Sequence, residues 1–189
     1  MKIYNLNKCV VLFVLLSFLA CSHTDVYKDT NMDFGAIQRV AVMPFANFSR
    51  DNQAASRVRD VFITMLMATS TVYVIPTGEV SSGILKTGMT DSSAPSEEEI
   101  KRFANIVNAD AVITGVVKEY GEVRSGSTPS NIISISMQMI EKDSANVVWS
   151  ASSTKGGVSI TDRLFGGGGV PVNDITEDAI NEILDKLFQ

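Results

Sequence analysis

Hydrophobic and polar positions along the chain predict five strands. The expected strands are residues 39–45, 71–76, 109–120, 133–139 and 147–153. The first is a continuous apolar run ended by a proline, which is typical of a strand buried on both faces. In the fourth strand, isoleucine and methionine alternate with serine and glutamine, so we expect one of its faces to be exposed to solvent. The last two should form an antiparallel hairpin, because a turn separates them near residues 143–146.

Three other stretches carry apolar residues at helical spacing, over residues 55–69, 96–107 and 174–188. Ser96 is followed three residues later by Glu99, which is the spacing of a capping box, so a helix should begin at Ser96. Residues 77–86 are expected to form a short helix or a turn. This order mixes alternating and consecutive strands, and it predicts the α/β (α+β) class, with a single mixed sheet and helices packed on it.

The third strand is apolar at its start and more polar towards its end. Gly115 within it indicates a close backbone approach or a β-bulge. Residues 125–130 are predicted to be the turn into the fourth strand. Only the short segment at residues 121–131 then joins these two strands.

Residues 1–20 have a different pattern, with two lysines, an apolar run and then small residues, which is typical of a removable signal peptide. The run is shorter than the roughly 20 residues that a membrane-spanning helix needs. Cys21 follows directly, and the segment resembles the bacterial lipoprotein signal, whose terminal cysteine is lipidated. Phe18 departs from that pattern, where leucine is usual. Ser22, in place of an aspartate after the cysteine, implies sorting to the outer membrane of a Gram-negative cell.

The mature chain is acidic. The whole sequence of 189 residues has a formal net charge of −5, and removing residues 1–20 takes away two lysines and no carboxylate, which leaves −7. Its basic residues are scattered, so binding to nucleic acid is not expected. Residues 21–35 are polar and predict a lipidated tether, and residues 36–189 form the folded domain. His23, the only histidine, lies in this tether, so a packed site has no histidine base.

The sequence predicts no enzyme. It has no Gly-x-Ser-x-Gly elbow, and after the signal peptide only the anchoring cysteine is left, so a partnered nucleophile is missing. No metal or cofactor is expected either, since consecutive glutamates at residues 97–99 suit the start of a helix without an ion. Asp110 is interpreted as a turn residue before a strand, and Trp149 as a core residue.

A glycine run at residues 166–169 lacks the Gly-Lys-Ser/Thr ending of a phosphate-binding loop. We interpret Phe165, Gly166 and Gly167 as a candidate partner surface. An equally good interpretation is a simple linker into the last helix.

Several segments together resemble the CsgG-like outer-membrane lipoprotein family: Val-Ala-Val-Met-Pro-Phe-Ala-Asn at residues 40–47, the strands at 72–76 and 109–117, and the end of the last hairpin at 148–150. The resemblance covers residues 37–188. It implies an α/β domain like that of curli-assembly and penicillin-binding-protein-activator lipoproteins, also similar to the amino-terminal domain of TolB.

The resemblance implies a non-enzymatic, lipid-anchored periplasmic protein that acts as an accessory in assembly or transport at the outer membrane. Curli-type channels insert extra amphipathic hairpins into the membrane, each strand with about 9–11 alternating residues. The chain has no such stretch, so we expect no pore of its own. The expected partners are the membrane, a periplasmic or outer-membrane protein, and further copies of the chain. The alternative function is activation of a peptidoglycan synthase, and a third hypothesis is an enzyme with perturbed acidic residues in a pocket.

Overall fold

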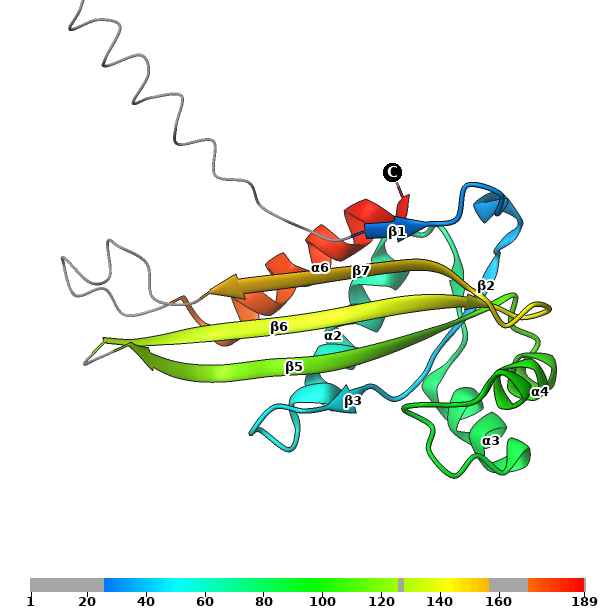
Figure 1. Cartoon of the computed structure of the whole chain (residues 1–189), viewed down its shortest axis with the longest axis horizontal. Coiled ribbons are helices and arrows are strands. Elements are labelled where there is room, and N and C mark those ends of the chain that lie inside the picture. The colour runs from blue at the N-terminus through cyan, green and yellow to red at the C-terminus, as the bar shows by residue number, and fades with distance from the viewer. Residues whose placement is uncertain (1–25, 126–127, 157–169, 189) are drawn as a thin grey trace, which may run out of the picture.

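The computed structural model describes residues 26–125, 128–156 and 170–188. Within them, seven strands form one mixed sheet on which four α-helices pack (Figure 1). The strands are β1 (Val26–Lys28), β2 (Arg39–Val42), β3 (Ala46–Asn47), β4 (Tyr73–Val74), β5 (Ala111–Ser125), β6 (Thr128–Glu141) and β7 (Val147–Gly156). The helices are the 3-10 helix η1 (Phe34–Ala36) and the α-helices α2 (Ala54–Ala68), α3 (Thr77–Thr87), α4 (Glu97–Val107) and α6 (Val172–Phe188). The predicted fold class is confirmed.

The strands lie in the order β1-β7-β6-β5-β2-β4, and β3 pairs with a later part of β5. β2 runs parallel to both β4 and β5, and β3 also runs parallel to β5. The other three pairs, β5–β6, β6–β7 and β7–β1, are antiparallel. The predicted hairpin of the last two strands is therefore confirmed. None of the described helices is long and apolar enough to cross a membrane.

Two hydrophobic cores lie on opposite faces of the sheet. α2 and α6 cover one face, where Val40 and Val42 of β2 are buried, and α3 and α4 cover the other, where Ala41 and Met43 are buried. Alternate residues of β2 thus enter different cores, as its unbroken apolar run predicts. Trp149 is fully buried in the first core, which confirms its predicted role.

α4 begins where its sequence predicts. The Ser96 side chain accepts a hydrogen bond from the Glu99 N–H, and the Glu99 carboxylate accepts one from the Ser96 N–H at 2.8 Å. Residues 77–87 form a complete helix, α3, which ends at Gly88 in the left-handed conformation.

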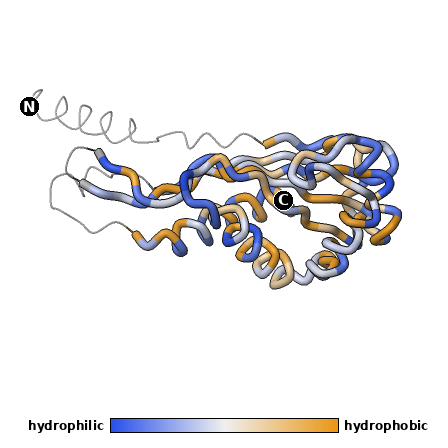
Figure 2. The backbone as a smooth tube through the Cα atoms, turned by 90° about the horizontal axis from the view of Figure 1, so that it is seen from below, coloured by the Kyte–Doolittle hydropathy of each residue, from blue (hydrophilic) through white to orange (hydrophobic). Residues whose placement is uncertain are grey.

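The β5–β6 hairpin is longer than predicted. Its paired residues continue from Ala111 and Glu141 out to Ser125 and Thr128, so most of the expected turn over residues 125–130 is strand. Seen from below in Figure 2, the hairpin reaches past α6 at one end of the molecule. Pairing of the two strands continues to that end, with one register shift between Val117 and Glu119, so the projecting part is joined to the body of the sheet through both strands.

The N-terminal segment also differs from its prediction. Val26, Tyr27 and Lys28 pair with Ala151, Ser150 and Trp149 of β7, and η1 follows within the same segment. Residues 21–35 are mostly polar, and for this reason the sequence predicts a tether over the whole segment. Because a strand can be held by backbone hydrogen bonds at a sheet edge, polar composition does not exclude it. The first described residue, Val26, lies only five positions after Cys21.

Candidate partner surface

The β3–α2 loop presents a large exposed aromatic side chain. β3 ends at Asn47, and the Phe48 N–H donates to the Val117 carbonyl of β5 at 2.8 Å, which fixes the backbone at the start of the loop. The Phe48 side chain is 76% exposed, so it contributes little to the core. An exposed phenylalanine on a fixed loop is the type of residue that anchors protein interfaces.

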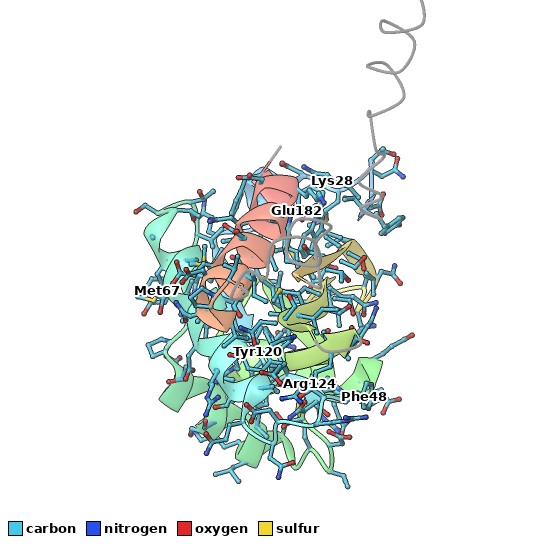
Figure 3. All side chains as sticks on the ribbon, turned by 90° about the vertical axis from the view of Figure 1, so that its left-hand side faces the viewer. Lys28, Phe48, Met67, Tyr120, Arg124 and Glu182 are labelled. Carbon is cyan, nitrogen blue, oxygen red and sulfur yellow. The ribbon has the colours of Figure 1, made fainter. Side chains whose placement is uncertain are left out.

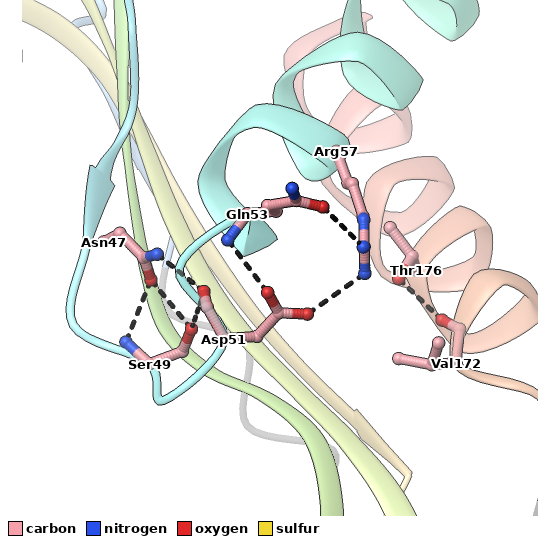
Figure 4. Close-up of polar contacts among 7 residues, drawn as sticks. All are labelled: Asn47, Ser49, Asp51, Gln53, Arg57, Val172 and Thr176. Carbon is pink, nitrogen blue, oxygen red and sulfur yellow. Dashed lines mark hydrogen bonds and ion pairs between the residues drawn. The ribbon is translucent and has the colours of Figure 1, made fainter.

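Polar contacts within the loop hold its shape (Figure 4). The Asn47 amide donates to the Asp51 carbonyl at 2.8 Å, and its oxygen accepts from both the N–H and the hydroxyl of Ser49, at 3.0 and 2.7 Å. Asp51 then accepts from the Gln53 N–H at 2.8 Å and pairs with Arg57 of α2 at 3.0 Å. These contacts bracket Phe48 on both sides and join the loop to the first turns of α2.

A groove separates this loop from the projecting hairpin. Its volume is about 680 Å³, and we call it the hairpin groove; its lining includes Phe48, Arg50, Lys118, Tyr120, Val123 and Ile132. Figure 3 shows Phe48, Tyr120 and Arg124 on the same side of the molecule, with Lys28 at the opposite end. The lining combines aromatic and aliphatic groups with charges of both signs, which is the composition of a protein interface with a polar rim.

A β-bulge shapes the hairpin side of this groove. The register of β5 and β6 shifts between Val117 and Glu119, so Val117 and Tyr120 both face the core that α2 and α6 cover. Without the extra residue, two positions three apart in a strand would point to opposite faces. The bulge therefore turns the distal half of β5 and places Tyr120 between the core and the groove.

Four carboxyl groups with shifted pKa values lie outside the hairpin groove. The pKa of Asp91 and that of Glu99 are lowered by hydrogen bonds from Ser93 and Ser96, respectively. Burial raises the pKa of Asp110 and that of Glu141, but hydrogen bonds from backbone N–H groups outweigh it, so both pKa values lie below the ordinary range. Each of these groups receives hydrogen bonds in a turn, a cap or a strand junction, which is a structural role.

Asp110 joins the starts of two parallel strands. Its carboxylate accepts from the Gln38 and Arg39 N–H groups at 3.1 and 2.9 Å and lies 3.5 Å from Lys142. The prediction that Asp110 is a turn residue before a strand is confirmed. In addition, its carboxylate connects this turn to the start of β2, about 70 residues earlier in the sequence. Among the described residues, no cluster of three or more His, Cys, Asp or Glu side chains is placed to hold a metal ion.

Sequence reasoning did not identify Phe48. A phenylalanine within the polar run Asn-Phe-Ser-Arg-Asp-Asn at residues 47–52 was the available signal. The predicted site residues Cys21, Phe165, Gly166 and Gly167, together with His23, lie outside the described residues.

Three solved structures resemble this fold. PelC from Paraburkholderia phytofirmans, a single-residue variant solved as a dodecamer, has a TM-score of 0.60 and 18% identity, over 87% of this chain and 96% of PelC. Lipoprotein GNA1162 from Neisseria meningitidis has a TM-score of 0.55 and 19% identity, over 78% and 99%. The LpoB C-terminal domain from Salmonella enterica has a TM-score of 0.51 and 13% identity, over 67% and 87%. At these identities the likeness shows the fold alone.

A search of curated proteins found no match. The family model that matches is GNA1162-like, a lipoprotein family, and it covers residues 31–189. It makes the broader resemblance to CsgG-like lipoproteins more specific, and these matches give no support to a role in curli secretion. Because the model covers most of the chain, this protein belongs to the GNA1162-like lipoprotein family.

Proposed function

We propose that this protein is a non-enzymatic, outer-membrane lipoprotein, anchored through lipidated Cys21, that assembles with copies of itself as an accessory of envelope assembly or transport. The observation that carries the proposal is Phe48, 76% exposed on a loop fixed by hydrogen bonds beside a projecting hairpin. Little conformational entropy is left to lose when such a loop is covered, so it is suited to a protein contact.

The dodecameric state of PelC supports the choice of further copies as the partner. The alternative, activation of a peptidoglycan synthase, has the shared fold of LpoB in its favour. To activate a synthase far from the outer membrane, the folded domain would need a long tether to its lipid anchor. Only five positions separate Cys21 from Val26, at most about 18 Å of extended chain, which is shorter than the predicted tether allowed. We therefore rank self-assembly first.

The test uses the full chain, extracted from membranes in mild detergent, with its mass measured particle by particle. We expect assemblies of several chains. Phe48→Asp should reduce them to monomers, because it places a charge at the centre of the contact. Leu85→Asp is the matched control: Leu85 is 81% exposed on α3, outside the residues that line the hairpin groove, so its replacement should leave the assemblies intact.

A monomeric wild-type chain, or assemblies that persist in Phe48→Asp, would overturn self-association through this loop. Co-extraction of a peptidoglycan synthase in place of further copies would reverse the ranking. Intact mass checks the anchor separately, because lipidation at Cys21 adds mass that Cys21→Ser cannot carry.

A further inference from the structure

A second groove lies at the other end of the sheet, where the segment before β2 passes the C-terminal ends of α2 and α6. We call it the apolar groove. Its volume is about 530 Å³, within the range of small-molecule sites. Val40, Ile113 and Met139 of three adjacent strands form its floor, and its walls include Phe34, Leu66 and Phe188.

The floor of this groove is part of the core itself. Val40 and Ile113 are fully buried and Met139 is 3% exposed, so core side chains close the floor, and an occupant of the groove would contact the more exposed wall residues Phe34, Val72 and Phe188. The lining is predominantly apolar, with Gln38 and Thr71 as its uncharged polar side chains. Such a wall favours a flexible hydrocarbon chain over a polar metabolite, because polar groups would be buried without hydrogen-bond partners.

Lys28 is the one charged side chain among the residues that line this groove. Its ammonium lies 4.8 Å from the centre of the Phe34 ring and donates to the Leu187 carbonyl at 3.4 Å. It forms no ion pair with any residue in the described ranges. An apolar cavity bordered by a cation that has no ion-pair partner within the described part of the chain is complementary to an amphiphile with an anionic head group.

The link to the anchor places this groove close to the bilayer. Lys28 lies seven positions after Cys21, which corresponds to at most about 25 Å of extended chain. Two residues between Cys21 and Lys28 are exposed hydrophobic groups: Val26 is 43% exposed and Tyr27 is 52% exposed. This step rests on the proposed lipidation of Cys21, since an unanchored chain would not be held at the membrane.

We propose that the apolar groove binds one acyl chain of an anionic phospholipid from the leaflet that holds the anchor, with Lys28 beside its phosphate. The occupant comes from the membrane and not from the protein's own lipid. The binding is non-covalent, so the protein would draw a single lipid partly out of the leaflet. Neither the family nor the fold comparisons supply this role.

The experiment uses the full lipidated chain reconstituted in vesicles of phosphatidylethanolamine and phosphatidylglycerol. A small part of the phosphatidylglycerol carries a diazirine in one acyl chain, and after irradiation the labelled peptides are mapped by mass spectrometry. We expect label on the peptides that contain Phe34, Val72 and Phe188. Val72→Trp, which fills the groove, should reduce this label at least fivefold, whereas Leu85→Trp on α3 should not change it.

Lys28→Glu should reduce labelling by the phosphatidylglycerol probe several-fold and have a smaller effect on a diazirine phosphatidylcholine probe of no net charge. Lys28 also contacts the last turn of α6, so thermal unfolding is measured for each variant. If Val72→Trp unfolds the chain, Thr71→Trp at the exposed border of the groove replaces it.

Equal labelling in the filled variant, or label confined to peptides outside the groove, would overturn the proposal. So would an absence of vesicle-derived label because the protein's own anchor chain occupies the groove. Vesicle flotation and intact mass separate the two hypotheses. A chain that is lipidated and floats without groove labelling refutes only the lipid site, whereas a chain that is not lipidated refutes the proposed anchorage.

Discussion

The ring of Phe45 fills the space that a side chain at Gly115 would need. A Cβ atom built on Gly115 would lie 2.7 Å from Phe45 Cδ1, and Phe45 itself packs on Phe62 with the ring centres 6.0 Å apart. The sequence predicts a close backbone approach or a β-bulge at Gly115; the structure places the Phe45 ring against the Gly115 backbone, and the β-bulge lies further along β5, between Val117 and Glu119. The contact joins β5, the β2–β3 connection and α2, three segments that are distant in sequence.

Gly115→Ala should therefore destabilise the fold. The Phe45 ring is buried and cannot move aside without disturbing Phe62, so we expect a loss of about 2 kcal/mol in the free energy of unfolding, as for other overpacked cores. Urea denaturation measures it. Gly78→Ala is the control, because nothing lies within 4 Å of a Cβ at Gly78 and alanine favours the helix. If Gly115→Ala left the free energy of unfolding unchanged, the position of the Phe45 ring would not be fixed.

The fold class was predictable because its signals are local. The apolar run of β2, the capping box of Ser96 and Glu99, and the period-two pattern of β6 each reflect burial or hydrogen bonding within a few residues. The extent of the β5–β6 hairpin was not predictable in this way. The bulge after Val117 shifts the alternation by one position, so the polar half of β5 no longer follows a single period of two.

The site was less predictable than the fold. Phe48 owes its role to exposure, and exposure depends on how Asn47 and Asp51 fold the loop and on where the hairpin projects. β1 is a similar case, because its pairing with β7 depends on an open sheet edge that is formed more than a hundred residues later.

Asp110→Ala should make stability less sensitive to acid. The folded-state pKa of Asp110 lies below its unfolded value, so its contribution is complete above the unfolded pKa of about 3.9 and is lost as the pH falls through the folded pKa. We expect a cost on the order of 2 kcal/mol near pH 7, from the lost hydrogen bonds to Gln38 and Arg39. The difference from wild type should shrink below pH 4.

Urea unfolding at pH 7, 5 and 3 checks this dependence. Asp178→Ala, an exposed replacement on α6, serves as the control and should cost little at any of these pH values. If the Asp110 variant lost the same stability at pH 3 as at pH 7, packing and not charge would explain the effect.

Ser96→Ala should weaken the start of α4. The substitution removes the hydroxyl that accepts from the Glu99 N–H, and a lost cap costs about 1 kcal/mol. Thermal unfolding followed by circular dichroism measures the change. Ser81→Ala is the matched control, since the Ser81 hydroxyl donates to the Thr77 carbonyl inside α3, where alanine is neutral or favourable. Equal effects of the two substitutions would contradict a capping role.

Asp51→Ala tests whether the loop is preorganised for its contact. The substitution removes the acceptor for the Gln53 N–H and the partner of Arg57, both at the start of α2 and outside the two cores. Folding should therefore change little. Self-association should weaken by about 1 kcal/mol, roughly fivefold in the dissociation constant, because the loop around Phe48 must then be ordered on binding.

Sedimentation of the detergent-extracted chain over a range of concentrations measures this dissociation constant. Asp91→Ala is the comparable control, because the Asp91 carboxylate likewise accepts from an N–H two residues later, in the loop between α3 and α4. The expected order of self-association is wild type equal to Asp91→Ala, then Asp51→Ala, then Phe48→Asp. An Asp51 variant that assembles as tightly as wild type would show that Phe48 acts without the order of its loop, because the ring would then bind equally well from a loosened backbone.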